Sequence, residues 1–142
     1  MVQPNDVAER LARGGRVQQL SRGDRAMGAN QLYRLWMESG PRILKAYGTP
    51  ARERRERHAL EALSHIDGIP VLLDRGSDGD VHWALFEDAG RWSLGSLPEN
   101  PSLGRKAGEI LRAVHDAGPA AMSNLSRGID QDWVAVDFIS TF

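Results

Sequence analysis

The sequence contains no cysteine, which excludes disulfide bonds, thiolate nucleophiles and cysteine-ligated metal sites. Its four histidines are scattered, so no zinc-binding spacing is present. No window approaches the ~18 consecutive apolar residues that a membrane-spanning helix needs, and the N-terminal segment lacks the apolar core of a signal peptide. We therefore expect a cytoplasmic protein that does not enter a membrane.

The sequence also lacks an excess of either charge. Lys and Arg total 18 and Asp and Glu total 19, which gives a net charge of −1 at pH 7. Such a balance provides no general attraction for nucleic acids or anionic membranes, and we expect neither as a partner. Hydrophobic residues make up 41% of the 142 residues and charged residues 26%, which is typical of one globular domain with a single core.

The N-terminal residues predict a short lead-in helix over residues 1–15. Asn5 or Asp6 can act as the N-cap, and the helix is expected to run to Leu11. The pair Gly14-Gly15 then ends it, because glycine favours helix C-termini.

Hydrophobic periodicity predicts the remaining elements, with period two for strands and period 3.6 for helices. In chain order we expect strands at 16–21, 31–37 and 42–47, a helix at 50–66, strands at 71–74 and 81–86 joined by a turn at 75–80, and a helix at 103–115 closed by Gly118-Pro119. The predicted fold class is α+β, a five-stranded antiparallel sheet with one helix inserted after the third strand, followed by one or two helices. Residues 133–139 are apolar and fit a strand or a helix start.

Three features in chain order are the parts of a phosphate-binding site of the protein-kinase kind. A turn with Gly23 and Gly28 lies between two strands, Lys45 lies on the next strand, and Glu56 lies on the helix that follows. In such a site backbone amides cover the phosphates, the lysine contacts the α- and β-phosphates, and the glutamate orients the lysine. The glycine spacing is not G-x-G-x-x-G, and a P-loop is excluded because no Gly-Lys-Ser/Thr run occurs. A lysine on a strand is otherwise commonly solvent-facing.

The order of five segments resembles the aminoglycoside phosphotransferase and choline-kinase-like branch of the kinase superfamily. The segments span about residues 16–118 and read GANQLYRL, RILKAYG, ERHALEALSHIDGIPVLL, HWALFEDAGRWSL and AGEILRAVHDAG. The resemblance implies that residues 16–90 form a nucleotide-binding N-lobe and that residues 91–142 form a hinge loop and the start of a helical lobe. It also implies ATP with Mg²⁺ as the cofactor and a small hydroxylated molecule as the acceptor.

Carried over residue by residue, the resemblance assigns the phosphate end of the site. Gly28 and Asn30 become the end of the phosphate loop, and Lys45 becomes the phosphate-binding lysine. Its helix partner becomes Glu56, which lies four and seven residues before two leucines, as in the family's Glu-x-x-x-Leu-x-x-Leu helix. Glu53 is the competing choice.

The resemblance also assigns the adenine end of the site. Residues 86–90 become the hinge between the lobes, where the backbone at Glu87 and Ala89 would hydrogen-bond to adenine. His115 looks like the terminal histidine of the family's Leu-x-x-Leu-His helix, which is a structural residue.

The catalytic motif of the family does not occur in the sequence. Phosphoryl transfer needs an aspartate base, a metal-binding asparagine and a second metal-binding aspartate, which the family supplies as His-Gly-Asp-x-x-x-x-Asn and a later Ile-Asp-Trp/Phe. The nearest imitation is His115-Asp116 with Asn124 and Asp137, where the aspartate-to-asparagine spacing is eight rather than five. We therefore identify no catalytic residue, and expect no phosphate transfer and only weak ATP binding by this chain.

Three interpretations stay open on the sequence alone. The chain is the N-lobe of a small-molecule kinase, or a stand-alone non-catalytic binding or regulatory module with that fold, or a small α+β domain whose kinase-like order is accidental. The sequence separates neither a fragment from a naturally short protein nor one acceptor from another. An exposed apolar face around Trp92, Leu94, Leu97 and the predicted helix at 103–115 would favour homo-oligomers.

Overall fold

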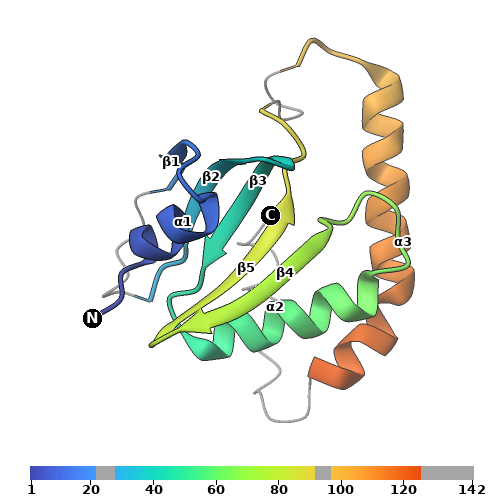
Figure 1. Cartoon of the computed structure of the whole chain (residues 1–142). Helices are drawn as coiled ribbons and strands as arrows, with labels where there is room; N and C mark the ends of the chain where they lie inside the picture. Colours follow the sequence, from blue (N-terminus) through green and yellow to red (C-terminus); the bar gives the residue numbers. More distant parts are fainter. Residues whose placement is uncertain (22–27, 92–96, 126–142) are drawn as a thin grey trace. The chain divides into compact units, whose positions relative to one another are not determined.

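The computed structural model describes residues 1–21, 28–91 and 97–125, with side chains described as far as residue 118 (Figure 1). Within these ranges it contains three helices and five strands. Their bounds are α1 Pro4–Ala12, β1 Val17–Gln19, β2 Gln31–Met37, β3 Gly40–Ala46, α2 Pro50–Leu63, β4 Leu72–Asp78, β5 Val81–Glu87 and α3 Pro101–Leu125.

The five strands form one antiparallel sheet in the order β1-β2-β3-β5-β4, and α2 follows the third strand. This arrangement confirms the predicted fold class. The hairpin between β2 and β3 is closed by two residues, since Met37 pairs with Gly40. Gly40 has φ of 106°, a left-handed conformation that glycine adopts without a steric penalty.

One face of the sheet packs against α1 and forms the hydrophobic core. Alternation along the strands places Tyr33 and Leu35 of β2 and Leu44 and Ala46 of β3 on this face. The buried members of the cluster are Val7, Ala8, Ala12, Tyr33, Leu35, Leu44, Ala46, Val81, Trp83 and Leu85. Lys45 lies between two core residues in sequence, so its side chain leaves the opposite face of the sheet.

Several predicted helices and strands begin or end at the wrong residue. The helix α1 begins at Pro4 with Gln3 at the N-cap, and the Gln3 N–H donates to the Asp6 carboxylate at 2.8 Å, so Asp6 lies inside the first turn. The prediction placed the cap too late because both Asn5 and Asp6 are good capping residues. The strand β1 is shorter than 16–21, and α2 ends at Leu63 rather than at residue 66.

The larger corrections concern β4 and α3. Residues 75–78 were predicted as a turn, but they extend β4 as far as Asp78, which pairs with Val81 across a turn at residues 79–80. The predicted helix end at Gly118-Pro119 is also wrong, because α3 continues to Leu125. Proline removes one helical hydrogen bond and bends a helix without always ending it. Figure 1 shows α3 changing direction in its last, red-orange turns.

The chain divides into two compact units. The first comprises Met1–Glu56 and Pro70–Ser93, and the second comprises Arg57–Ile69 and Leu94–Phe142. All six residues predicted to contact a nucleotide belong to the first unit. None of the helices in the described ranges combines the length and the apolar character that a membrane crossing requires.

Candidate functional site

The centre of the candidate site is an ion pair between β3 and α2. Lys45 pairs with Leu32 of β2 and Ala84 of β5 in the sheet, and its Nζ lies 2.6 Å from Oε2 of Glu56. Lys45 is only 9% exposed, and the Glu56 side chain is 24% exposed. A lysine this buried is rare unless it is paired, because desolvation of an unpaired ammonium group is costly. The lysine is therefore fixed on the sheet face opposite α1.

Tyr47 is a third member of this cluster, and sequence reasoning missed it. Its ring centroid lies 5.4 Å from Nζ of Lys45, and its side chain is buried. Burial raises the pKa of Tyr47 far above its ordinary value, and the negative charges of Glu56 and Glu53 act in the same direction. The phenol therefore stays neutral at pH 7. The available signal was the Lys-x-Tyr spacing, which places both side chains on one face of a strand.

Glu53, the competing partner for Lys45, lies one turn earlier on α2 and pairs elsewhere. Its Oε1 is 3.8 Å from Nη1 of Arg75 on β4, and its side chain is 15% exposed. The start of α2 is held by Thr49, whose Oγ1 accepts the Arg52 N–H at 3.3 Å. The structure therefore joins Lys45 to Glu56 and Arg75 to Glu53.

Gly28 and Asn30, predicted as the end of a phosphate loop, lie against the turn between β3 and α2. The Asn30 Oδ1 accepts the Gly48 N–H at 3.1 Å. A Cβ on Gly48 would lie 2.1 Å from the Gly28 carbonyl oxygen, so only glycine fits there. Gly28 itself has φ of 74°. The backbone entering β2 is thus fixed at Asn30, two residues before Leu32, which pairs with Lys45. Gly23 lies outside the described residues.

The predicted hinge follows β5. Glu87 is the last residue of the strand, and its backbone N–H donates to the Val71 carbonyl at 3.0 Å. Ala89 is exposed. Glu87 lies three residues beyond Ala84, the strand partner of Lys45, which corresponds to a separation of about 10 Å along β5. Lys45 therefore lies between the Gly28–Asn30 end of the sheet and the hinge end.

The backbone of residues 86–90, the predicted hinge, is held by a buried ion pair that sequence reasoning also missed. Asp88 receives hydrogen bonds from Nε and Nη2 of Arg34, at 2.7 and 3.4 Å, and from the Gly90 N–H at 2.9 Å. The Arg34 and Asp88 side chains are 12% and 7% exposed. Burial acts to raise the pKa of Asp88, but the Gly90 N–H and the hydrogen bonds and charge of Arg34 outweigh it and lower that pKa. Strand register, which brings Arg34 to this end of the sheet, was not available from the sequence.

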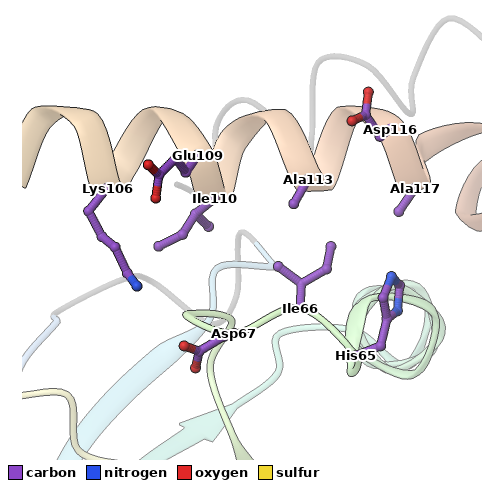
Figure 2. Close-up of a pocket in the computed structure, with 9 residues that line it drawn as sticks. All are labelled: His65, Ile66, Asp67, Lys106, Glu109, Ile110, Ala113, Asp116 and Ala117. Atoms are coloured by element: carbon purple, nitrogen blue, oxygen red, sulfur yellow. The ribbon is translucent and has the colours of Figure 1, made fainter.

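A cavity of about 590 Å³ lies in the second unit, between the segment after α2 and one side of α3 (Figure 2). Figure 2 shows Ile66 pointing toward the α3 face that carries Ile110 and Ala113. The charged residues that line the cavity, among them Asp67 and Lys106, are exposed. No residue predicted to bind nucleotide lines this cavity.

The remaining predicted features fall mainly outside the site. His115 is exposed on α3, and Leu97 is partly buried, whereas Trp92, Leu94 and Asp137 lie outside the described residues. In the described part of the chain no three His, Asp or Glu residues are grouped to hold a metal ion.

Comparison with known proteins does not assign the chain to a family. No protein-family model matches the sequence, and no curated protein is significantly similar to it.

Proposed function

We propose that this chain is the nucleotide-binding lobe of a cytoplasmic, ATP-dependent phosphotransferase that acts on a small hydroxylated substrate. The observation that carries the proposal is the Lys45–Glu56 ion pair, with Nζ and Oε2 2.6 Å apart. A lysine held by a helix glutamate on the sheet of an α+β lobe is the arrangement that kinases use to contact nucleotide phosphates. An ammonium group has three N–H donors, and the contact with Glu56 uses one of them.

The two ends of the sheet indicate how a nucleotide would be oriented along it. The Gly28–Asn30 segment lies at the end nearest Lys45, where the phosphates would be. The hinge lies about 10 Å away along β5, where adenine would be. The Glu87 N–H is already engaged by Val71, so the contact proposed at Glu87 involves its carbonyl oxygen, while the contact at Ala89 involves its backbone N–H.

The proposal assigns nucleotide binding, and not phosphoryl transfer, to the residues described. ATP would bring Mg²⁺, which neutralises charge on the β- and γ-phosphates during transfer. The described residues contain no group of three or more carboxylate or histidine side chains placed to hold that ion. We therefore expect ATP to bind with a dissociation constant that is not submicromolar.

The direct test is titration of the purified chain with ATP and Mg²⁺ by isothermal calorimetry. We expect Lys45→Met to weaken ATP binding about tenfold or more, because a charge-assisted contact to phosphate is lost. Lys106→Met is the matched control, since Lys106 is exposed on α3 in the other compact unit. The double variant Lys45→Met/Glu56→Gln keeps the buried charges balanced, so its weakened binding cannot be attributed to an unpaired Glu56.

Two results would contradict the proposal. Equal ATP affinity of the wild type and of Lys45→Met would show that the lysine is not a phosphate ligand. ATP-dependent phosphorylation of an alcohol by the chain would show that the assignment of binding without transfer is wrong.

A further inference from the structure

We propose that the Arg34–Asp88 ion pair makes the nucleotide site selective for adenine over guanine, by fixing the backbone at Ala89 that would contact the base. The inference rests on the function proposed above. Arg34 and Asp88 are positioning residues in it, because they act on the base through the backbone of residues 87–90.

The pair connects two strands that are not neighbours, since β3 lies between β2 and β5 in the sheet (Figure 1). Arg34 of β2 is paired with Ile43 of β3, and Ile43 is paired with Phe86 of β5. The Arg34 side chain extends past β3 to the first residue after β5, where its Nε lies 2.7 Å from Oδ2 of Asp88. The end of β5 is therefore held by β2 as well as by its neighbour β3.

Gly90 is anchored by both members of the pair. Its N–H donates to Oδ1 of Asp88 at 2.9 Å, and its carbonyl oxygen accepts from Nη2 of Arg34 at 3.4 Å. The Asp88 carboxylate thus closes a turn in which an Asp side chain bonds to the backbone two residues later. Gly90 has φ of 101°, which glycine adopts without a steric penalty. The pair therefore sets the conformation of this turn as well as its position.

Ala89 lies between two anchored residues. On one side the Glu87 N–H donates to the Val71 carbonyl at 3.0 Å, and on the other side Gly90 is held by the ion pair. Ala89 itself is exposed, so a ligand can approach its backbone. Because the chain is held on both sides, the Ala89 N–H has a restricted direction before a ligand arrives, which lowers the ordering cost of binding.

Adenine and guanine present opposite hydrogen-bonding groups to such a backbone. A carbonyl oxygen at Glu87 and an N–H at Ala89 match adenine, whose N6 amino group donates and whose N1 accepts. Guanine has an acceptor at O6 and a donor at N1, so both contacts would be mismatched. The mismatch weakens guanine binding only if the backbone groups cannot turn to suit the other base. Selectivity therefore depends on what holds the backbone of residues 87–90.

The test is calorimetric titration of the chain with ATP, GTP and tripolyphosphate, each with Mg²⁺. We expect the wild type to prefer ATP, and Asp88→Asn to reduce the ratio of ATP to GTP affinity about tenfold. Tripolyphosphate binding should not change, because Lys45 is not altered. Asp78→Asn is the matched control, since Asp78 pairs with Arg10 at the surface of the same compact unit, and it should change none of the three affinities.

The double variant Arg34→Leu/Asp88→Asn separates positioning from stability. It leaves no unpaired buried charge, so the fold should regain part of the stability that Asp88→Asn loses. It still lacks the link between β2 and the residues after β5, so the ratio of ATP to GTP affinity should stay as low as in Asp88→Asn. Recovery of selectivity together with stability would overturn the inference, since the pair would then only stabilise the fold.

The remaining outcomes distinguish this inference from the proposed function. A wild type that binds ATP and GTP equally, or a ratio that Asp88→Asn leaves unchanged, would overturn the role of the pair and leave the proposed function standing. Equal weakening of ATP and tripolyphosphate binding in Asp88→Asn would overturn that role as well. A wild-type chain that binds neither ATP nor tripolyphosphate would overturn both proposals.

Discussion

Substitution of Asp88 by asparagine tests whether the backbone after β5 depends on the buried ion pair of Asp88 with Arg34. Asparagine has nearly the same shape, and its Oδ1 can still accept the Gly90 N–H. The change removes the charge that faces Nε and Nη2 of Arg34, and so leaves the guanidinium group, in a side chain only 12% exposed, without its counter-charge.

The magnitude follows from the geometry of the pair. Two charge-assisted hydrogen bonds are weakened, and such bonds contribute ~1.5–3 kcal/mol each in mutational series. The pair lies at the end of the sheet, so the loss should be below the ~3–5 kcal/mol found when a fully buried pair is broken. We expect Asp88→Asn to lower the free energy of unfolding by about 2–3 kcal/mol at pH 7.

The pH dependence of this difference has a definite sign. The pKa of Asp88 is lowered in the folded chain, so its ionised form stabilises the fold above the unfolded pKa of ~3.9. The contribution is lost as the pH falls through the folded pKa. The difference in free energy of unfolding between the wild type and Asp88→Asn should therefore be largest at pH 7 and should decrease below about pH 4.

The assay is urea unfolding followed by tryptophan fluorescence, with far-UV circular dichroism as a second probe. Asp78→Asn is the control, because Asp78 pairs with Arg10 at the surface, where the side chains are 29% and 54% exposed. Exposed pairs contribute ~0–1 kcal/mol. The double variant Arg34→Leu/Asp88→Asn should recover part of the lost stability, since no unpaired buried charge remains. Losses from Asp88→Asn and Asp78→Asn that agree within error would refute the reasoning.

Two further predictions concern Tyr47 and two glycines. Folding raises the pKa of Tyr47, so the neutral phenol contributes fully to the free energy of unfolding below the unfolded pKa of ~10. This contribution is lost as the pH rises above that value. Urea unfolding should therefore show a steeper loss of stability from pH 9 to 11 for the wild type than for Tyr47→Phe. Gly48→Ala should cost about 1–3 kcal/mol, because its Cβ would lie 2.1 Å from a carbonyl oxygen. Gly108→Ala, in α3 with nothing within 4 Å of its Cβ among the described residues, should instead stabilise by about 0.5–1 kcal/mol; thermal unfolding that moves in the same direction for both would contradict this.

The sequence was sufficient for strands with apolar alternation and insufficient where backbone pairing alone holds a strand. The bounds of β2 agree with the predicted 31–37, and β5 differs from 81–86 by one residue, because both have a clear apolar pattern. Residues 75–78 of β4 read RGSD, which has turn-forming composition and no alternation. Their pairing with β5 places them in the sheet despite that composition.

The candidate site was predictable in its residue types but not in all its contacts. The sequence alone indicates Lys45 on a strand, Glu56 on the next helix and a glycine-containing turn before them. Hydrogen bonds across the sheet are not visible, because they depend on register. Arg34 and Asp88 lie 54 residues apart in the chain and meet through the pairing of β2, β3 and β5.

The unresolved choice between Glu53 and Glu56 and the wrong boundary of β4 have the same cause. The two glutamates are three residues apart on α2, so helical geometry places both on one face and cannot decide which one meets Lys45. The extension of β4 places Arg75 opposite Ala84, and Ala84 is itself opposite Lys45, so two cations lie in one row across the sheet. Each glutamate then has its own partner, with Glu53 toward Arg75 and Glu56 toward Lys45. A strand that ended at residue 74 would have left Arg75 in a turn and both glutamates as candidates for one lysine.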